Sequence, residues 1–498
     1  MNISINRHAG ISVKEQVKLE LAQRIRSGLL EDGQRLPSVR QLSAQLKISL
    51  VTAHQVYKTL EQDGLIESIR GRGTFVRFHK ISINKNTQNT ISFGSNPFAW
   101  QLSIPDNLPR ASFWSQSAVR LPAEILDLST ASIHYTLLPL DLLQTSIRYS
   151  LDRYSQSHGS YSPYQGDLEF LQTISCYLSE QSNIALRPHQ LIITNGTQQG
   201  MDLFARTFLG PGDVVAVEAP CFPSAIDIFR LSPAVIQPVP IDDNGMRVDI
   251  LEELSTRMKI KALYTVPTFQ NPTGLIMSLN RRREILEFAE TNNVLILEDD
   301  PHRELFLSGN GDIGRLPPPL KSMDKTGRVV YLKGFSKFLF PGLRLGVTAA
   351  DGSVYNRLLA AKSIADLGSP LWLQKALIRL FASPQLYSYI KKLNQILVRR
   401  SRLVAAKLAR ELSPAIRFPE ISGGMHLWLT LPPAVSADSL IPVAHHRGIH
   451  FLPGSIFYPA EPESNHLRIC WTNLSDDNLP KALDILCELL NEAVVGAQ

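Results

Sequence analysis

The sequence predicts an α/β fold preceded by a small helical module. Two observations support this: apolar runs typical of buried strands alternate with helical patterns through most of the chain, and the first 80 residues hold three short amphipathic patterns and a hairpin. The length of 498 residues allows several domains. We expect a first domain over 1–78, a linker over 79–110 and an α/β body over 111–498, with a smaller subdomain from about 385.

The composition is that of an ordinary globular protein, with 44% apolar and 19% charged residues. The start, MNISINRHAG, lacks the segments of a secretory signal, and no run of about 18 apolar residues could cross a bilayer. We therefore expect a soluble, cytoplasmic protein without membrane contact. Cys176, Cys221, Cys470 and Cys487 show no CxxC spacing, which argues against a zinc site or a disulfide framework and predicts reduced core residues.

The excess positive charge lies at the N-terminal end. Residues 1–80 contain 13 Lys and Arg against 7 Asp and Glu, whereas the other 418 residues hold 38 of each sign. The formal net charge of +6 therefore belongs to the first domain. A small basic module joined to a neutral body indicates contact with a polyanion, although a basic solvated surface would also explain the charge.

Three helical patterns are expected in this first domain. The first covers 14–30, the second is PSVRQLSAQL with a cap at Pro37 and Ser38, and the third begins after a capping Ser49 and ends at Gly64. The apolar positions expected to face the core are Val17, Leu21, Ile25 and Leu29, then Val39, Leu42 and Leu46, then Val51, Val56 and Leu60. Only a few residues separate the second and third patterns, as in a helix-turn-helix.

A hairpin and a linker follow these helices. LIESIRGRGTFVRF alternates apolar and polar positions around Gly71, Arg72 and Gly73, which predicts a hairpin with a cationic tip, or wing. From about 79 to 110 the chain is rich in Ser, Asn, Thr, Gln and Pro, which favours a linker.

The body contains six strand-like runs: QLIITNG, DVVAVEA, ALYTVP, NVLILEDD, RVVYLKG and RLGVTAA. Short buried strands that alternate with helices predict a mostly parallel sheet covered on both faces. From about 385, long helical patterns and GGMHLWLTL indicate a small α+β subdomain.

The first domain resembles the winged helix-turn-helix of the GntR family from about residue 11 to 77, through SGLLEDGQRLPSVRQLSAQLKISLVTAHQVYKTLEQDGLIES and RGRGTFV. The resemblance implies that the second helix of the pair enters the major groove of double-stranded DNA and that the wing touches the neighbouring groove or backbone. Free N–H groups at a helix start and Arg side chains suit phosphates. The expected DNA-binding residues are Arg35, Ser38 and Arg40 on the backbone, Ser49, Thr52, His54 and Gln55 at the bases, and Arg70, Gly71, Arg72 and Gly73 in the wing.

One departure concerns base reading. Leu50 stands where the family often has Arg, which leaves open which base is read. The alternative for this domain is a winged helix that serves as a protein-interaction module.

The body carries GFSK followed by Arg344, seven residues after Lys337. This segment resembles the cofactor-lysine segment of fold-type I aminotransferases, and the resemblance implies a Schiff base between Lys337 and pyridoxal 5′-phosphate (PLP), with Arg344 at the phosphate and Ser336 among the cofactor-binding residues. TNGTQQG lies between a strand and a helix, so the amides of Gly196, Thr197 and Gln198 would point at an anion. The fold class implied is a fold-type I large domain with a small C-terminal subdomain.

Other segments match the same family in chain order. The resemblance implies that Asn271 in QNPTG binds the phenolic oxygen, that Asp299 in LEDDP pairs with the pyridine nitrogen and that Phe222 stacks on the ring. Tyr161 matches a Tyr that crosses to the phosphate of a second subunit, which implies a homodimer, and Arg468 matches the residue that holds a substrate or effector carboxylate.

Two positions depart from the family pattern. His302 replaces a Tyr that donates to the phenolic oxygen, and Gly334 replaces a hydroxyl residue at the phosphate. Each lost buried hydrogen bond weakens cofactor binding by about 1 to 3 kcal/mol. We expect PLP to bind and any transamination to be weak.

The combination of both resemblances matches the MocR-type subfamily of GntR-family regulators and covers almost the whole chain. It implies a transcriptional regulator that binds DNA and senses PLP, or a PLP adduct with an amine or amino acid, without a metal. Two alternatives remain: an active PLP-dependent aminotransferase with an accessory N-terminal domain, and a DNA-binding protein whose body has lost PLP and serves only for dimerisation. The effector, the operator and the direction of regulation stay open.

Overall fold

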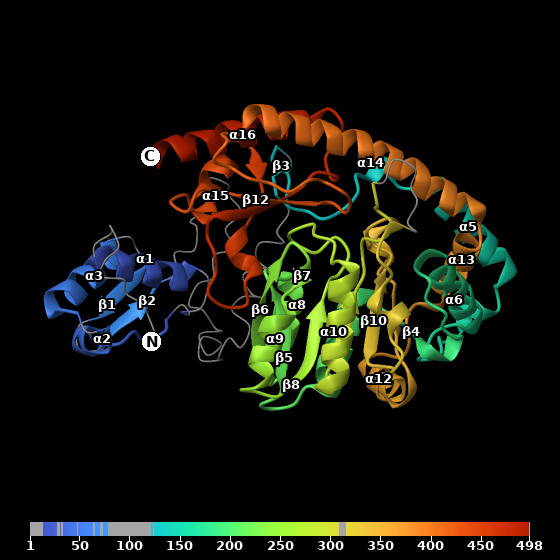
Figure 1. Cartoon of the computed structure of the whole chain (residues 1–498). Helices are drawn as coiled ribbons and strands as arrows, with labels where there is room; N and C mark the ends of the chain where they lie inside the picture. Colours follow the sequence, from blue (N-terminus) through green and yellow to red (C-terminus); the bar gives the residue numbers. More distant parts are fainter. Residues whose placement is uncertain are drawn as a thin grey trace, which may run out of the picture. The chain divides into compact units, whose positions relative to one another are not determined.

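A computed structural model describes residues 13–26, 30, 33–46, 48–62, 65–69, 73–77, 121–122, 124–307 and 315–497. The chain divides into two compact units, 1–120 and 121–498 (Figure 1). The expected linker at 79–110 and the residues Leu29, Gly64, Arg70, Gly71 and Arg72 lie outside the described residues. None of the helices in the described part of the chain combines the length and apolar character that a membrane span requires.

The first unit is a three-helix module with a two-stranded hairpin. Its elements are α1 (Val13–Arg26), α2 (Val39–Leu46), α3 (Leu50–Gln62), β1 (Ile66–Ile69) and β2 (Gly73–Val76). The strands pair antiparallel, and residues 33–36 pair with the other edge of β2 through hydrogen bonds of 2.9 Å from Gly33 N to Val76 O and from Leu36 N to Thr74 O. The winged helix-turn-helix is therefore confirmed.

The core of this unit follows the predicted helical stripes with one exception. Val17, Leu21, Ile25, Leu42, Leu46, Val56 and Leu60 are buried, and Val39 packs against them. Val51, expected in the core, is 67% exposed. The buried stripe of α3 is Ala53, Val56, Tyr57 and Leu60, at helical spacing i, i+3, i+4 and i+7. Val51 lies two residues before this stripe and therefore points outward.

The second unit is built on an eight-stranded sheet of order β4-β11-β10-β9-β8-β5-β6-β7. The strands are β4 (Leu191–Thr194), β5 (Val214–Ala219), β6 (Val235–Asp242), β7 (Gly245–Met246), β8 (Ile260–Thr265), β9 (Leu295–Asp299), β10 (Val329–Gly334) and β11 (Gly346–Ala349). Pairs from β10 to β6 are parallel, whereas β11 runs antiparallel to both neighbours and β7 runs antiparallel to β6. The mostly parallel sheet is confirmed, and all six predicted runs form strands of it.

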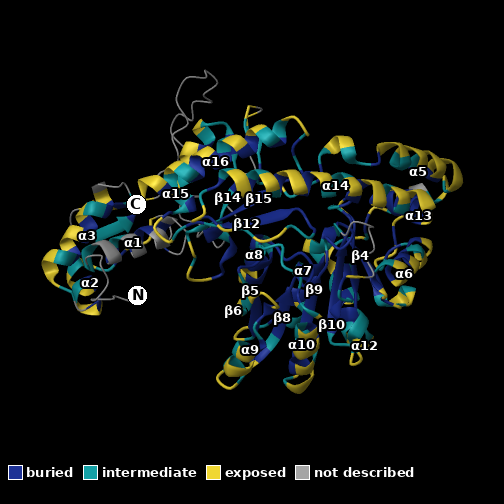
Figure 2. Ribbon diagram, turned by 45° about the horizontal axis from the view of Figure 1, so that its top comes forward, coloured by how far each residue is buried: buried dark blue, intermediate teal, exposed yellow. Residues whose placement is uncertain are grey.

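Helices cover both faces of this sheet, whose strands are buried in Figure 2. One face packs against α7 (Gly196–Phe208), α8 (Pro223–Leu231) and α12 (Gly352–Ala365). The other packs against α9 (Val248–Ser255), α10 (Leu279–Thr291) and α11 (Leu320–Met323), and, nearer β4, against α6 (Leu168–Ser182) and α13 (Leu371–Phe381). Strand alternation sorts the side chains, since Val215 and Val217 join the first layer and Val214 and Ala216 the second.

The C-terminal part forms a second, smaller layer of helices and strands. Its elements are α14 (Pro384–Glu411), β12 (His426–Thr430), α15 (Ala437–His446), β13 (Ile449–His450), β14 (Leu452–Pro453), β15 (His466–Cys470) and α16 (Asn478–Gly496). Three strands form a sheet of order β12-β15-β14. A segment from the start of the unit joins this part, because β3 (Leu126–Asp127) pairs with β13.

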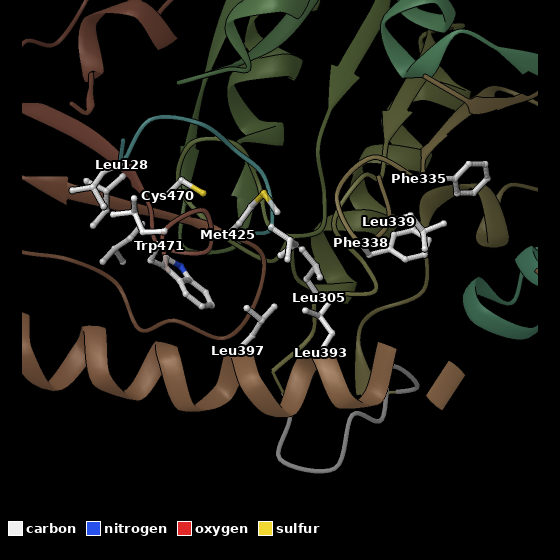
Figure 3. Close-up of a cluster of buried hydrophobic side chains, with 14 of the residues drawn as sticks. Leu128, Leu305, Phe335, Phe338, Leu339, Leu393, Leu397, Met425, Cys470 and Trp471 are labelled. Carbon is white, nitrogen blue, oxygen red and sulfur yellow. The ribbon is translucent and has the colours of Figure 1, made fainter. Parts of the chain in front are cut away.

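One large apolar cluster connects the C-terminal part to the main sheet. Figure 3 shows Leu393 and Leu397 of α14 pointing toward Leu305, Met425 and Trp471. Phe335, Phe338 and Leu339, just after β10, belong to the same cluster and lie on the large-sheet side. The segment that carries Lys337 is therefore fixed between the two parts.

Among the predicted core cysteines, Cys221, Cys470 and Cys487 are buried, but Cys176 is exposed. The prediction was wrong for Cys176 because it lies on α6 beside Tyr177, whose side chain takes the buried position on this turn. The remaining elements of the unit are α5 (Leu140–Arg153) and the short 3-10 helices η2 (Tyr135–Leu137), η3 (Ser157–Gly159), η4 (Pro188–Gln190), η6 (Pro341–Leu343) and η7 (Gly454–Phe457).

Candidate functional site

Five predicted cleft residues lie at the carboxyl ends of strands in the large sheet. They are Gly196 after β4, Phe222 after β5, Asn271 after β8, Asp299 at the end of β9 and Lys337 after β10. These five strands share one direction. Carboxyl ends of parallel strands meet at one edge of a sheet, where open α/β folds bind ligands. The structure therefore brings these residues to one edge.

Asp299 presents one unpaired oxygen to this edge. Its side chain is buried, and Oδ2 accepts a hydrogen bond of 3.1 Å from the Tyr264 hydroxyl, whereas Oδ1 has no partner. Burial raises the pKa of Asp299 to about 7, against the opposing hydrogen bond from Tyr264. A buried acceptor without a donor is costly. The N–H of a protonated ring nitrogen would satisfy Oδ1 and favour the ionised carboxylate.

Lys337 carries the amine of the cleft. Its Nζ donates a hydrogen bond of 2.9 Å to the carbonyl of Ala131, and the side chain is partly buried. Burial lowers the pKa of Lys337, and the charges of Arg468 and Arg344 act in the same direction. A lowered pKa increases the fraction of neutral amine, which is the form that attacks an aldehyde.

Arg344 lies beside the first turn of α7, where the sequence predicts an anion site. A Cβ atom added to Gly196 would lie 2.8 Å from Nη2 of Arg344, so the guanidinium sits directly at the helix N-terminus. Arg344 itself has a φ of 47°, a left-handed conformation that non-glycine residues rarely adopt and that is common at ligand sites. Free amides, the helix dipole and a guanidinium together suit a phosphate.

The departure at position 334 has a steric reason. A Cβ atom on Gly334 would lie 3.2 Å from Cγ2 of Thr197, so a hydroxyl residue there would press on that side chain. Thr197 is half-buried, Gln198 is exposed and Ser336 is half-buried. Gly334 therefore leaves room for the Thr197 side chain beside the predicted phosphate site, where the family pattern has a hydroxyl residue at 334.

Asn271 and Arg468 meet across the cleft although 197 residues separate them. Nη1 of Arg468 donates to Oδ1 of Asn271 at 3.2 Å, and Nη2 donates to the carbonyl of Ser129. Nε of Arg468 is buried and has no partner, and the guanidinium lies over the Phe457 ring at 5.3 Å. Burial lowers the pKa of Arg468 to about 10. The arrangement leaves a buried donor for a carboxylate.

His302 and His426 form a buried pair beside these residues. Their ring centroids lie 5.1 Å apart with an interplanar angle of 89°. None of the four ring nitrogens has a hydrogen-bond partner, although the backbone of Phe269 acts on the pKa of His302 in the raising direction. Burial and nearby cations, Lys337 first for His302 and Arg468 first for His426, lower both pKa values well below the ordinary range. Both rings are therefore neutral at pH 7.

Tyr161 lies differently from the other predicted residues, whereas Phe222 follows β5 at the sheet edge. Phe222 is half-buried at the N-terminus of α8 and packs against the cluster beneath the sheet. Tyr161 lies before α6 and is 82% exposed, so its own chain does not enclose it. The structure of one chain does not bring Tyr161 into the cleft.

The residues predicted to read DNA lie around two capped helix starts of the first unit. Ser38 Oγ accepts from Gln41 N at 3.3 Å while Gln41 Oε1 accepts from Ser38 N at 2.8 Å, a capping box. Ser49 Oγ accepts from Thr52 N at 3.0 Å and so begins α3. Arg40, His54 and Gln55 are exposed.

Arg35 is the predicted phosphate-binding residue that lies closest to the wing. A Cβ atom on Gly73 would lie 2.9 Å from Nε of Arg35. The backbone of Arg35 also pairs with that of Phe75 of β2 in an antiparallel β-bridge. Leu50 and Val51, at the start of α3, are 52% and 67% exposed. Apolar and polar side chains therefore share the surface that would meet the bases.

Comparison with protein families decides the classification. The family described as aminotransferase class I and II matches residues 135–486, and the family of bacterial regulatory proteins described as gntR matches residues 13–76. The chain belongs to the aminotransferase class I and II family. Its N-terminal unit is a GntR domain, and the order of the two domains is that of the MocR-type regulators.

Two relatives align with nearly the whole chain. The HTH-type transcriptional regulator YdfD of Bacillus subtilis is 27% identical over 487 residues, which covers 95% of each chain. The HTH-type transcriptional regulator YjiR of Escherichia coli is 28% identical over 463 residues, which covers 92% of this chain and 94% of the relative.

A solved aminotransferase has the same fold as the second unit. The α-aminoadipate aminotransferase LysN of Thermus thermophilus, complexed with N-(5′-phosphopyridoxyl)-L-leucine, is 27% identical with a TM-score of 0.72. The superposition covers 80% of this chain and 99% of the LysN chain. PLP is the cofactor of this aminotransferase family, and the fold-type I class predicted from the sequence is confirmed.

Three features of this aminotransferase-family cleft were not predicted. His426 lies on β12, within a segment that the sequence indicated only as part of a small subdomain. Tyr264 donates a hydrogen bond to Asp299 from the neighbouring strand, and in the sequence it looks like any other aromatic residue of a buried strand. The carbonyls of Ser129 and Ala131 bind Arg468 and Lys337, and backbone contacts of this kind leave no residue signal. A usable signal for His426 was its place in the strand HLWLT, because a polar residue stands there among positions that are all buried up to Leu429.

Proposed function

We propose that this regulator binds PLP covalently in its aminotransferase-family unit and that the bound state controls DNA binding by its GntR unit. The observation that carries the proposal is that three features lie at one edge of the sheet. They are the buried Asp299 Oδ1 without a hydrogen-bond partner, the amine of Lys337, and the guanidinium of Arg344 at the start of α7. Three polar groups of PLP then have a matching group: the ring nitrogen, the aldehyde and the phosphate. When bound, PLP supplies an electron-withdrawing ring that would stabilise negative charge on the α-carbon of an attached amine.

Each residue of the cleft has a proposed role toward this cofactor. Asp299 holds the proton of the ring nitrogen, Lys337 provides the amine, and Asn271 and His302 face the phenolic oxygen. Arg344, Ser336 and the amides of Gly196, Thr197 and Gln198 hold the phosphate. Phe222 covers the ring, and Arg468 receives a carboxylate of the effector.

We propose further that the protein acts as a homodimer. Large apolar side chains are exposed along the start of the second unit and its α5–α6 region, namely Tyr135, Leu140, Tyr149, Leu151, Tyr161, Tyr164 and Leu168. So many exposed apolar residues in one region indicate an interaction surface. A second copy would cover them and bring Tyr161 to the phosphate of the other subunit.

DNA binding would then depend on ligand through linkage. If two conformations of the dimer space the GntR units differently, a ligand that binds one better shifts DNA affinity by its differential affinity. For a dimer, we also expect two half-sites in the operator.

The test is a DNA-binding titration of the full-length protein with and without PLP, using wild type and Lys337→Ala. Wild type should acquire a visible absorption band with PLP, become labelled by borohydride at Lys337, and change its DNA affinity. Lys337→Ala should lose the band and the PLP dependence while it keeps DNA binding. Lys325→Ala, an exposed lysine of the same unit, is the control. PLP-independent DNA affinity in the wild type would refute the regulatory proposal.

A second candidate is aminotransferase activity, because Arg468 leaves a buried donor for a carboxylate beside the amine of Lys337. Turnover of an amino acid with a 2-oxo acid would reveal it. Rapid turnover together with DNA binding that ignores PLP would favour the enzyme over the regulator. Replacement of a family Tyr by His302 and the loss of the hydroxyl at Gly334 favour slow turnover.

A further inference from the structure

Three side chains of the cleft leave buried nitrogens without partners. These are both ring nitrogens of His302, both of His426, and Nε of Arg468. His302, His426 and Arg468 are 2%, 3% and 4% exposed. Buried donors and acceptors are nearly always paired in folded proteins, and an unpaired one is costly. Such a cluster therefore indicates a polar ligand.

The small sheet presents His426 and Arg468 on one face. β12 and β15 pair antiparallel with His426 opposite Cys470 and Trp428 opposite Arg468. Residues directly opposite, and residues two apart on one strand, share a face. His426 and Arg468 are therefore diagonal neighbours, with side chains close enough for one small group to contact both.

The face that carries them is turned toward the cleft. Met425, Leu427, Leu429 and Ile469 alternate with the polar positions and pack in the apolar cluster on the other side. The charge of Lys337 acts on both imidazoles, and Arg468 binds Asn271. His302 and His426 therefore lie near the amine and the guanidinium.

The chemistry of this space selects against a cation. Lys337, Lys333 and Arg468 act on His302, and these positive charges together with burial keep both imidazoles neutral. Each neutral ring offers one N–H donor and one acceptor. A metal ion is not favoured, since no group of three or more His, Cys, Asp or Glu in the described residues could hold one.

We propose that His426 is a carboxylate-binding residue of the effector site, in which its imidazole N–H and Nε of Arg468 contact one effector carboxylate while His302 fixes the ring of His426 edge-on. The effector is then an amino acid, bound through its amine to the cofactor and through its carboxylate to this pair. An amine without a carboxylate leaves these buried nitrogens unpaired and binds weakly. This inference rests on the proposed PLP function.

The test compares two ligands that differ only in the carboxylate. 2-Methylalanine has no hydrogen on its α-carbon, so proton abstraction there cannot consume it, and isopropylamine is the same molecule without the carboxylate. Each is titrated into PLP-loaded full-length protein, and the change of the visible absorption band gives the affinity. We expect wild type to bind 2-methylalanine at least about tenfold more tightly than isopropylamine.

The variants are His426→Phe, which keeps the ring shape without donors, and His426→Asn, which keeps a donor. His426→Phe should weaken 2-methylalanine about tenfold and leave isopropylamine unchanged, and His426→Asn should recover part of the loss. His445→Phe makes the same replacement in the half-buried pair His445–His450 elsewhere on the small layer and should alter neither affinity.

The outcomes separate this inference from the function on which it rests. Equal weakening of both ligands in His426→Phe, or no weakening of either, would overturn the carboxylate role. A wild-type protein that shows no absorption band after PLP addition would instead overturn PLP binding itself. If His426→Phe does not fold, the comparison of the two ligands in wild type and His426→Asn still decides, because equal affinity of both ligands contradicts the proposal.

Discussion

The two units offer their ligands opposite kinds of surface. In the GntR unit, Arg40, His54 and Gln55 are exposed, and the serines that begin α2 and α3 already have their hydrogen bonds. In the aminotransferase unit, Asp299 and Arg468 are buried and each keeps one atom without a partner. The capping serines of the first surface have hydrogen-bond partners without a ligand, whereas the second surface leaves buried polar atoms without partners.

This difference predicts different physics of binding. Contacts of exposed cations with phosphates release counterions, so their strength falls steeply with salt. A ligand that hydrogen-bonds a buried atom without a partner removes the free-energy penalty of leaving that atom unpaired. Such contacts depend little on salt and stabilise the folded state. DNA affinity should therefore follow ionic strength, whereas PLP should raise the melting temperature of the second unit.

The largest expected effect comes from the buried carboxylate. Asp299→Asn keeps the shape but removes the charge that pairs with a protonated ring nitrogen, and we expect a loss of about 100-fold in PLP affinity, measured by absorption titration. Asp300→Asn is the matched control, because Asp300 is likewise buried, with one oxygen that accepts a hydrogen bond from Tyr331 at 3.0 Å and one without a partner, but it has no proposed contact with PLP. Equal losses in both variants would show that the effect is structural.

A second effect follows from the pKa values in the cleft. The pKa of Asp299 is raised to about 7, so in the ligand-free protein it is protonated below pH 7 and ionised above. The pKa of Lys337 is lowered, and its neutral form also increases with pH. Both changes favour PLP at higher pH, and we expect affinity to rise about tenfold from pH 6 to pH 8. Asp299→Asn should flatten this rise, and an affinity that falls with pH would contradict the assignment.

The sequence predicted most of the fold because its signals are local. Buried strands such as 214–219 are short apolar runs, and the capping residues Ser38 and Ser49 stand before the helices they begin. Val51 was placed wrongly because a single apolar residue in the first turn fits more than one helical stripe. Tertiary packing through Ala53 and Tyr57 chose the stripe.

The cleft was predictable only where residues stand in recognisable segments. Gly196, Asn271, Asp299 and Lys337 follow strands, so the rule of parallel strand ends gathers them. The contact of Arg468 with Asn271 spans 197 positions and depends on how the small sheet packs. The partner-free state of His426 could not be predicted, since it is a property of its surroundings.

The next effect concerns the exposed surface. Arg40→Ala should weaken DNA binding about fivefold at moderate salt and reduce the slope of log affinity against log salt by about 1, because one phosphate contact is lost. PLP affinity should not change. Arg257→Ala, which removes an exposed arginine from the second unit, is the control for net charge. A salt slope that stays constant in Arg40→Ala would place this residue away from the phosphates.

The smallest effect separates stability from DNA contact at one residue. Ser49→Ala removes the acceptor of Thr52 N and should cost about 1 kcal/mol of stability, which lowers the melting temperature of the first unit by about 4 to 8 °C. Ser49→Asp keeps a capping oxygen and should restore the melting temperature, but its negative charge faces the DNA and should weaken binding further. Calorimetry of the full-length protein and DNA titration measure the two effects separately. If Ser49→Asp restores both stability and DNA affinity, Ser49 acts only as a cap and does not face the bases.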